Sequence, residues 1–241
     1  MSDFRSFFVN PNNIDNKEFF LDENESHHLR KVLRLKIHNE IYLIDGKGTA
    51  YRAIIEKISK EKVFGKILEV YPSFGEPFCD INLAIGVIKP SRMQWVLEKA
   101  TECGVSNISP IQMDRSIKRS FNQERYKAII KSSTKQCARS KIPYLYKPQS
   151  LSEWLTSQID IPIIVCSQES KNKLSELREL LPSDCSRINL VIGPEGDFSD
   201  NEILLLNNYQ SIFVSLGTRR LRTESAAVSA VSIINQILIR G

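Results

Sequence analysis

The sequence predicts an α/β protein with two domains, a small β-rich domain over residues 1–72 and a larger domain with a mainly parallel sheet over residues 78–241. Three observations support this prediction. Apolar runs separated by turn residues fill the first domain, whereas buried runs of strand length alternate with helical patterns from residue 80 onward. Between the two, residues 72–77 are rich in Pro and Gly, which is typical of a linker. With 41% apolar and 25% charged residues, the composition is that of a globular protein with a buried core.

Two apolar stretches, residues 40–58 and 62–72, indicate the strands of the first domain. Turn signals interrupt the first stretch at Asp45-Gly46 and Lys47-Gly48. Strands joined in this way predict a small barrel or sandwich.

In the second domain, residues 81–88 form a continuous apolar run, as expected for a strand covered on both faces. A helix should follow, because Ser91 and Gln94 fit a capping box and Gly104 is placed to end it. The same alternation predicts helices near 123–138, 151–159 and 170–181, strands at 161–166, 188–193 and 211–217, a second capping box at Ser199 and Glu202, and a long final helix from about Thr223. Strands that alternate with helices imply a mainly parallel sheet.

The net charge of +5 is unevenly distributed. Residues 115–147 contain ten Lys or Arg and one acid, Glu124, which gives a local charge of +9. This density favours a polyanionic partner, because a protein that neutralises phosphates releases their counterions. The alternative is a solvated helix face.

Composition also limits the cellular setting and the cofactors. No apolar run has the length of a signal peptide or a membrane span, so we expect a cytoplasmic protein with no membrane partner. The five cysteines form no C-x-x-C pair, so we expect neither a disulfide framework nor a bound metal.

Two loops, residues 192–199 and 216–225, each follow a predicted strand and lead into a predicted helix. In an open α/β sheet, ligands bind outside the carboxyl ends of the strands, where such loops gather. Their glycines allow close approach of a ligand to the backbone, although any one of them can instead serve a tight turn. Neither loop matches the dinucleotide or phosphate-loop fingerprints. All three histidines lie in the first domain, so acid-base chemistry in the second must rest on carboxylates, arginines or backbone groups.

An ordered set of short motifs resembles one known family. These motifs are His28-Leu29, Val32–Leu35, Glu98–Glu102 with Gly104-Val105, Arg115-Ser116, Gln136 with Arg139 and Pro143, Ile192–Gly196 with Phe198-Ser199 and Glu202, Leu216-Gly217 with Arg219, and Leu221–Glu224 with Ala226. The family is that of the RsmE-type methylases of the SPOUT class, which use S-adenosylmethionine to methylate N3 of a uridine in small-subunit (16S) ribosomal RNA. The resemblance covers nearly the whole chain.

The resemblance implies more than the residue pattern does. It implies that residues 1–72 form a PUA-like barrel that binds RNA and that residues 78–241 form a SPOUT methyltransferase domain with a deep trefoil knot. It further implies a homodimer that acts on 16S ribosomal RNA, within the small ribosomal subunit.

Carried over position by position, the resemblance also implies a cofactor pocket. Its residues would be Cys166, Ser167, Ile192, Gly193, Gly196, Ser215, Leu216, Gly217, Leu221, Thr223 and Ser225. Leu216 and Leu221 would enclose the adenine, unless they are simply part of the core. Asp197 stands where the family has a glycine, Arg220 where it has an aliphatic residue, and Ser225 where it has a threonine.

For methyl transfer to uridine N3, the nitrogen must lose its proton. We expect Arg222 and Arg219 to stabilise the developing negative charge, and Glu195 or Glu224 to accept the proton. The alternative for Glu224 is a charge that serves the first turn of the final helix.

Six basic residues are candidates for contacts with RNA phosphates. They are Arg30, Lys31 and Arg34, expected on one helical stripe of the first domain, and Arg115, Arg119 and Arg139 in the second domain.

Three other functions remain open from the sequence. The nearest is a knotted RNA methyltransferase that acts on a ribose 2′-hydroxyl. A second is a non-catalytic RNA-binding or ribosome-assembly factor, in which Asp197 and Arg220 have abolished cofactor binding. The weakest is a nicotinamide oxidoreductase, because its glycine fingerprint is missing.

Overall fold

The chain divides into two units in the computed structural model, which describes residues 6–116, 121–158 and 160–239. One unit comprises Met1–Glu76 with Thr134–Ile142, and the other comprises Pro77–Ser133 with Pro143–Gly241. The sequence analysis assigned everything after residue 78 to one domain and did not predict that the 134–142 segment packs with the first unit.

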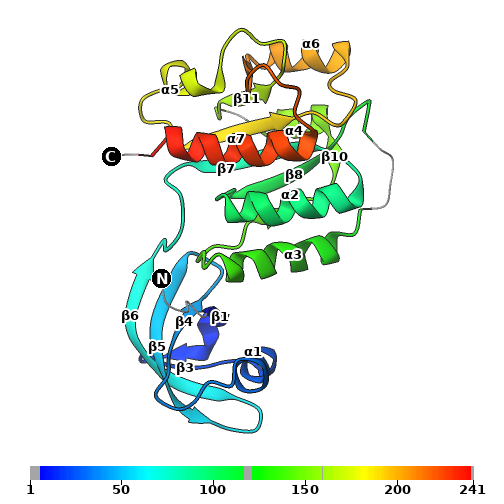
Figure 1. Cartoon of the computed structure of the whole chain (residues 1–241). Helices are drawn as coiled ribbons and strands as arrows, with labels where there is room; N and C mark the ends of the chain where they lie inside the picture. Colours follow the sequence, from blue (N-terminus) through cyan, green and yellow to red (C-terminus); the bar gives the residue numbers. More distant parts are fainter. Residues whose placement is uncertain (1–5, 117–120, 159, 240–241) are drawn as a thin grey trace. The chain divides into compact units, whose positions relative to one another are not determined.

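The first unit is built on a six-stranded sheet in the order β1-β4-β5-β6-β3-β2 (Figure 1). The strands are β1 (Ser6–Phe8), β2 (Ile14–Asp15), β3 (Glu18–Phe20), β4 (Glu40–Ile44), β5 (Thr49–Ile58) and β6 (Val63–Pro72). β1 and β4 are parallel, and the other strand pairs from residue 6 onward in this sheet are antiparallel. Asp45 closes the predicted turn, since its carboxylate accepts hydrogen bonds from the backbone of Lys47, Gly48 and Thr49. The β-rich first domain is therefore confirmed.

A helical segment that follows β3 packs against this sheet. Asp22 caps α1 (Glu23–His27) by accepting the Glu25 N–H, and a π-helical turn (His28–Val32) continues from it. Leu29 lies on the buried side of that turn, in the core with Phe7, Phe19 and Leu43.

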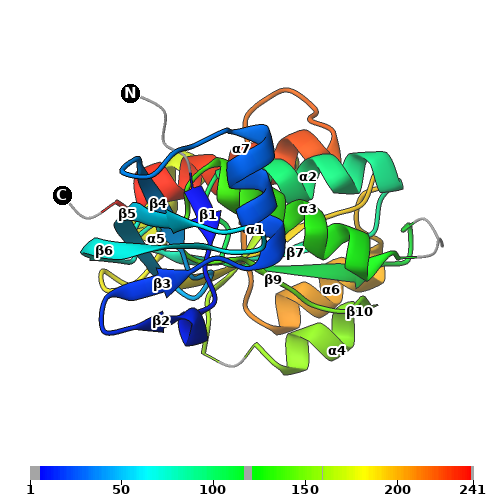
Figure 2. The same cartoon turned by 90° about the horizontal axis from the view of Figure 1, so that it is seen from below.

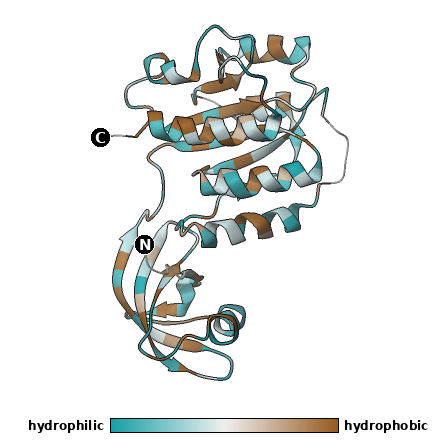
Figure 3. Ribbon diagram, viewed as in Figure 1, coloured by the Kyte–Doolittle hydropathy of each residue, from teal (hydrophilic) through white to brown (hydrophobic). Residues whose placement is uncertain are grey.

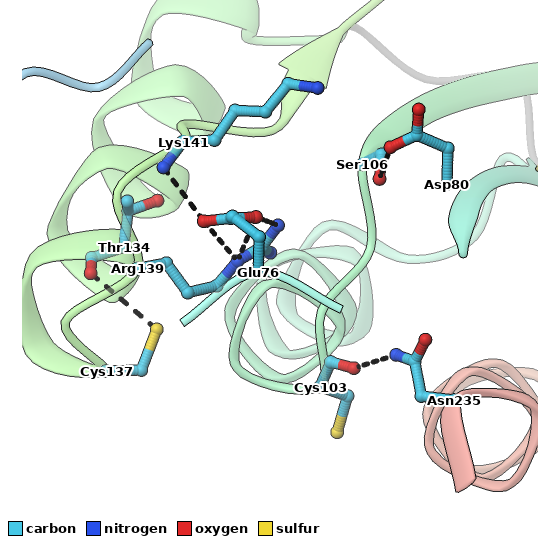
Figure 4. A network of polar contacts seen from close by, with 9 residues as sticks. All are labelled: Glu76, Asp80, Cys103, Ser106, Thr134, Cys137, Arg139, Lys141 and Asn235. Atoms are coloured by element: carbon cyan, nitrogen blue, oxygen red, sulfur yellow. Dashed lines mark hydrogen bonds and ion pairs between the residues drawn. The ribbon is translucent and has the colours of Figure 1, made fainter. Parts of the chain in front are cut away.

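The 134–142 segment is tied to this unit by a buried ion pair (Figure 4). Arg139 is 2% exposed, and its guanidinium donates to both carboxylate oxygens of Glu76, the shortest contact being 2.6 Å from Nη2 to Oε2. The same carboxylate accepts the Lys141 N–H at 2.9 Å. Charge-assisted bonds of this kind are stronger than neutral ones, so Glu76 fixes the segment firmly.

The second unit is an α/β domain with a parallel sheet in the order β10-β8-β7-β12-β11-β13, with β9 also paired to β8. The strands are β7 (Asp80–Gly86), β8 (Asn107–Gln112), β9 (Tyr144–Leu145), β10 (Gln149–Ser150), β11 (Ile163–Cys166), β12 (Arg187–Ile192) and β13 (Ile212–Val214). Every pair is parallel, which confirms the predicted sheet. The central strands are rich in hydrophobic residues (Figure 3), as a sheet covered on both faces requires.

Helices cover both faces of this sheet. The helices of this unit are α2 (Pro90–Glu102), α4 (Leu151–Thr156), α5 (Leu177–Leu180), α6 (Asp200–Asn208) and α7 (Thr223–Ile237), while α3 (Gln123–Gln136) begins in this unit and ends in the 134–142 segment of the first. Figure 2 shows α2 and α7 on one side of the sheet and α4 and α6 on the other. The Trp154 and Leu206 side chains of the second pair pack with strand residues Val165 and Val191.

The two predicted capping boxes had different outcomes. Ser199 and Glu202 form the box at the start of α6 as predicted. The prediction for Ser91 and Gln94 was wrong, because α2 begins one residue earlier, at Pro90, with Lys89 as its cap and no side-chain bond. Proline is well suited to a first helical turn, where its missing N–H costs nothing.

No helix in the described part of the chain has the length and apolar character needed to cross a membrane. The trefoil knot stays a prediction from the resemblance.

Candidate functional site

A cavity of about 370 Å³ opens at the carboxyl ends of β11, β12 and β13. Its size falls within the usual range of small-molecule sites. It gathers the residues after Cys166, the loop after Ile192 and the loop from Leu216 to Thr223. The two glycine-bearing loops that the sequence singled out therefore lie around one enclosure, as expected at this edge of a parallel sheet.

Most of the residues assigned from the resemblance line this cavity. They are Cys166, Ser167, Ile192, Gly193, Leu216, Gly217, Leu221 and Thr223 among the cofactor candidates, and Glu195, Arg219 and Arg222 among the catalytic candidates. Arg92 and Ala226 were not predicted as site residues, Gln168 and Pro194 lie in segments expected at the pocket but were not singled out, and Asp197 and Arg220 were noted only as departures from the family.

Two glycines let the loops close around the cavity. A Cβ on Gly86, at the end of β7, would lie 2.6 Å from the backbone nitrogen of Pro194, so only glycine lets the 193–198 loop approach the strand this closely. Gly217 has φ +110°, a conformation that other residues rarely adopt, and a Cβ there would meet no atom within 4 Å. The space beside the Gly217 Cα is thus open, and its N–H and carbonyl are both bonded to the Ser215 hydroxyl.

Part of the cavity wall is apolar. Ile192, Leu216, Leu221 and Ala226 contribute to it. Leu221 is 37% exposed, so the alternative that it is merely a core residue does not hold. Burial raises the pKa of the Cys166 thiol to about 12, which keeps this residue a neutral part of the wall.

Three of the cofactor candidates lie elsewhere. A Cβ on Gly196 would lie 2.9 Å from Cβ of Arg115, so this glycine makes room for a neighbouring side chain. The backbone of Ser215 is already used, because its N–H donates to Asn172 and its carbonyl accepts from Leu174. Ser225 is turned away, since on α7 the cavity is lined by Thr223 and Ala226, one helical turn apart.

One arginine joins two carboxylates at the cavity. Arg92, in the first turn of α2, donates from Nη1 to Oε1 of Glu195 at 3.1 Å. Its Nε lies 3.5 Å from Oε1 of Glu224. Glu224 does not line the cavity, but it contacts a residue that does. The sequence signal for Arg92 was its position just after the strand at 81–88, at the sheet edge where ligands bind.

The other arginines at the cavity are exposed. Arg219, Arg220 and Arg222 line it, and none of them has an ion-pair partner among the described residues. The N-terminus of α7 also opens here, because its cap residue Arg222 makes no side-chain bond to the first turn. Unpaired guanidinium groups and uncapped N–H groups together favour binding of a negatively charged group at this end of the cavity.

Asp197 fits the loop geometry despite replacing a glycine. Its φ is +64°, in the left-handed region that Asp tolerates better than most residues. Its N–H donates to the Pro194 carbonyl at 3.0 Å, and its carboxylate accepts the Phe198 N–H at 2.9 Å. The turn is therefore closed in the normal way.

The three basic candidates of the first unit do not form one helical stripe, which corrects the prediction. The helical segment ends at Val32, and Arg34 lies beyond it with φ +52°. Arg30 is half-buried and donates to the Ser59 carbonyl at 2.7 Å. Lys31 and Arg34 are exposed and remain available for phosphate.

The basic candidates of the second group also differ. Arg139 is buried and paired with Glu76, so the expectation that it contacts phosphate was wrong. Arg115 is exposed, and its Nη1 donates to the Gly196 carbonyl at 2.9 Å, beside the cavity loop. Arg119 lies outside the described residues.

The parallel sheet and the cavity at its carboxyl edge define an α/β protein with a site of small-molecule size where such sheets bind ligands. The chain belongs to the RNA methyltransferase family, because the model of the RNA methyltransferase domain matches residues 75–235 and that of the RNA methyltransferase PUA domain matches residues 21–68.

Known proteins extend the likeness to both units. The crystal structure of a ribosomal RNA small subunit methyltransferase E from Neisseria gonorrhoeae bound to S-adenosylmethionine has a TM-score of 0.87 and 26% identity, over 98% of each chain. Proteins of the same name from Rickettsia conorii and Bacillus subtilis are 26% and 27% identical, over 95% and 90% of this chain and 94% and 89% of their own. The fold class predicted from the sequence is thereby confirmed.

Proposed function

We propose that this chain is an S-adenosylmethionine-dependent methyltransferase that methylates N3 of a uridine in small-subunit (16S) ribosomal RNA. The observation that carries the proposal is the cavity formed by the loops around Gly193 and Gly217, in a chain that is similar over almost its whole length to a methyltransferase solved with this cofactor. The choice of uridine N3 comes from the family resemblance.

The residues of the cavity suit the cofactor. Because Gly217 has no side chain, the nucleoside can come close to its backbone, and Leu216 and Leu221 supply apolar surface for adenine. When bound, the cofactor would supply a methyl group on a sulfonium sulfur, and in-line attack of a nitrogen on the methyl carbon would release the neutral thioether. The protein must therefore align the nitrogen with the methyl group and exclude water.

The chain's own residues manage the proton and the charge. As the new N–C bond forms and the S–C bond breaks, the N3 proton passes to a carboxylate, for which Glu195 and Glu224 are the candidates. Arg219 and Arg222 stabilise negative charge on the base carbonyls. The Arg92 contact of Glu224 supports a part in this site for that residue, beyond serving the first turn of α7.

For the partners, we propose that the first unit binds RNA through exposed basic residues, including Lys31 and Arg34. We further propose that the protein works as a homodimer on the small ribosomal subunit and that it acts in the cytoplasm. The ribosomal RNA named in its relatives supports the substrate class and this location.

The decisive experiment is methyl transfer from labelled cofactor to isolated small subunits and to naked 16S RNA, followed by nucleoside mass spectrometry. N3-methyluridine is the expected product. A ribose-methylated nucleoside would replace the proposal by the 2′-hydroxyl alternative. Absence of cofactor binding in calorimetry would instead favour the non-catalytic assembly factor.

The assignment of the proton acceptor has its own test. Glu224→Gln should keep cofactor affinity while turnover falls about 10²- to 10⁴-fold, the usual contribution of a general base. Unchanged turnover would remove Glu224 from this role and leave Glu195.

A further inference from the structure

Arg92, Glu195 and Glu224 come from three separate elements: Arg92 and Glu195 line the cavity, and Glu224 contacts Arg92. Arg92 belongs to α2, Glu195 to the loop after β12, and Glu224 to α7. Their side chains are 30%, 25% and 13% exposed, so all three are largely removed from solvent. The guanidinium contacts the two carboxylates through different nitrogens, Nη1 for Glu195 and Nε for Glu224.

The second oxygen of each carboxylate is the unusual feature. Oε2 of Glu195 and Oε2 of Glu224 are both buried, and neither has a hydrogen-bond partner among the described residues. Buried carboxylate oxygens are normally bonded, so two open acceptors at one site are costly for stability. A bound donor from a substrate would relieve that cost.

We infer that Arg92 is a positioning residue, which holds Glu195 and Glu224 as a pair and leaves Oε2 of Glu195, on the cavity wall, free to accept a proton or hydrogen bond from the substrate base. The inference rests on the proposed function and assigns to it a residue that the sequence did not single out. Two carboxylates placed close together repel each other, and the guanidinium between them offsets that repulsion. The planar guanidinium also fixes the direction of both groups, which an ammonium cannot do.

Three variants test this role. Arg92→Met removes the charge and both contacts, so kcat should fall about 100-fold or more while KM for RNA changes little, because misplacement of reacting groups costs about that much. Arg92→Lys keeps the charge and should recover part of the loss. The matched control is Lys89→Met, which removes one exposed positive charge just before α2 and should leave kcat unchanged.

The pH profile of kcat separates positioning from a purely structural role. Without the guanidinium, the two carboxylates face each other uncompensated, so the acid limb of the Arg92→Met profile should move to higher pH. The other charged groups that line the same cavity, and are unchanged in this variant, are Asp197, Arg219, Arg220 and Arg222. In addition, Arg92→Met combined with Glu224→Gln should lose less than the product of the two single losses, because both act through one carboxylate.

The outcomes are distinguishable. If the native protein transfers no methyl group, the proposed function fails. If it is active and Arg92→Met keeps the native kcat and acid limb, or loses only affinity for RNA, the inference is overturned. Thermal melting of each variant shows whether it is folded. If Arg92→Met does not fold, Arg92→Lys takes its place, and a native kcat together with a native acid limb in that variant would overturn the inference.

Discussion

Substitution of Gly86 by Ala should distort the cavity wall, because Gly86 lies where β7 contacts the loop that carries Gly193 and Glu195. The added Cβ would lie 2.6 Å from the Pro194 nitrogen and 3.0 Å from its Cα. Ordinary contacts begin near 3.4 Å, so backbone must move by about 0.8 Å. Strand β7 is paired on both sides, with β8 and β12, and cannot easily give way. The loop must move.

The expected magnitude follows from this geometry. Overpacking of a buried site costs about 1–3 kcal/mol, which in a chain of this length lowers Tm by about 2–12 °C. The displaced loop also lines the cofactor cavity. We therefore expect affinity for S-adenosylmethionine to fall about tenfold or more, equivalent to about 1.4 kcal/mol.

Differential scanning fluorimetry and calorimetric titration with S-adenosylmethionine measure the two effects. The matched control is Gly65→Ala in the first unit, where a Cβ would lie 2.1 Å from the Ile54 carbonyl oxygen. That variant should also melt at lower temperature, yet it should bind the cofactor with native affinity. If Gly86→Ala keeps both the native Tm and the native affinity, the argument from the close approach to Pro194 is refuted.

Three further predictions concern stability, backbone and thiols. Glu76→Gln should lower the free energy of unfolding by about 3–5 kcal/mol in urea denaturation, because it leaves the buried Arg139 guanidinium without its countercharge; a loss below 1 kcal/mol would show that the pair contributes little. Asp197→Gly should match the native protein in stability and Asp197→Ala should lose about 1 kcal/mol, because φ is +64°; equal stability of the two variants would contradict this. Burial raises the pKa of both Cys79 and Cys166 to about 12, so alkylation of these thiols in the native state, followed by mass spectrometry at pH 8, should be far slower than for a free thiol. Because the pKa of each thiol is higher in the folded state, the thiols of the unfolded chain ionise first as pH rises. The contribution of these two thiols to the free energy of unfolding should therefore be complete below about pH 9 and should decline as pH rises toward 12. A rise in the free energy of unfolding over that range would contradict the assignment.

The elements that the sequence predicted well are those with a strong local signal. The strand at residues 81–88 and the capping box of Ser199 were predicted because burial on both faces requires a continuous apolar run and helix capping requires particular residue types at fixed spacing. Strand β8 was missed because NISPIQ contains Pro110, and a proline usually argues against a strand inside a sheet.

The site was predictable where the chain needs a glycine, at Gly217 because its φ is +110° and at Gly193 because a Cβ would lie 3.2 Å from the Phe198 ring. It was not predictable where a side chain acts across the fold. The contact of Arg92 with Glu195 joins residues 103 positions apart, and the bond of Arg139 to Glu76 joins residues 63 positions apart. Local patterns carry no information on such pairs, so one arginine was overlooked as a site residue and the other was misassigned to RNA.

The non-catalytic alternative requires that Asp197 and Arg220 prevent the cofactor from entering the cavity. The geometry argues against this effect for each of the two residues. Asp197 adopts the left-handed backbone that a glycine would supply, and its carboxylate is held by the Phe198 N–H at 2.9 Å within its own loop. Arg220 is exposed and lines the enclosure without filling it, since the cavity keeps a volume of about 370 Å³. If calorimetry finds that Asp197→Gly and Arg220→Leu each bind S-adenosylmethionine as the native protein does, the departures are neutral replacements. If either substitution creates binding that the native protein lacks, the cavity described here does not serve the native chain.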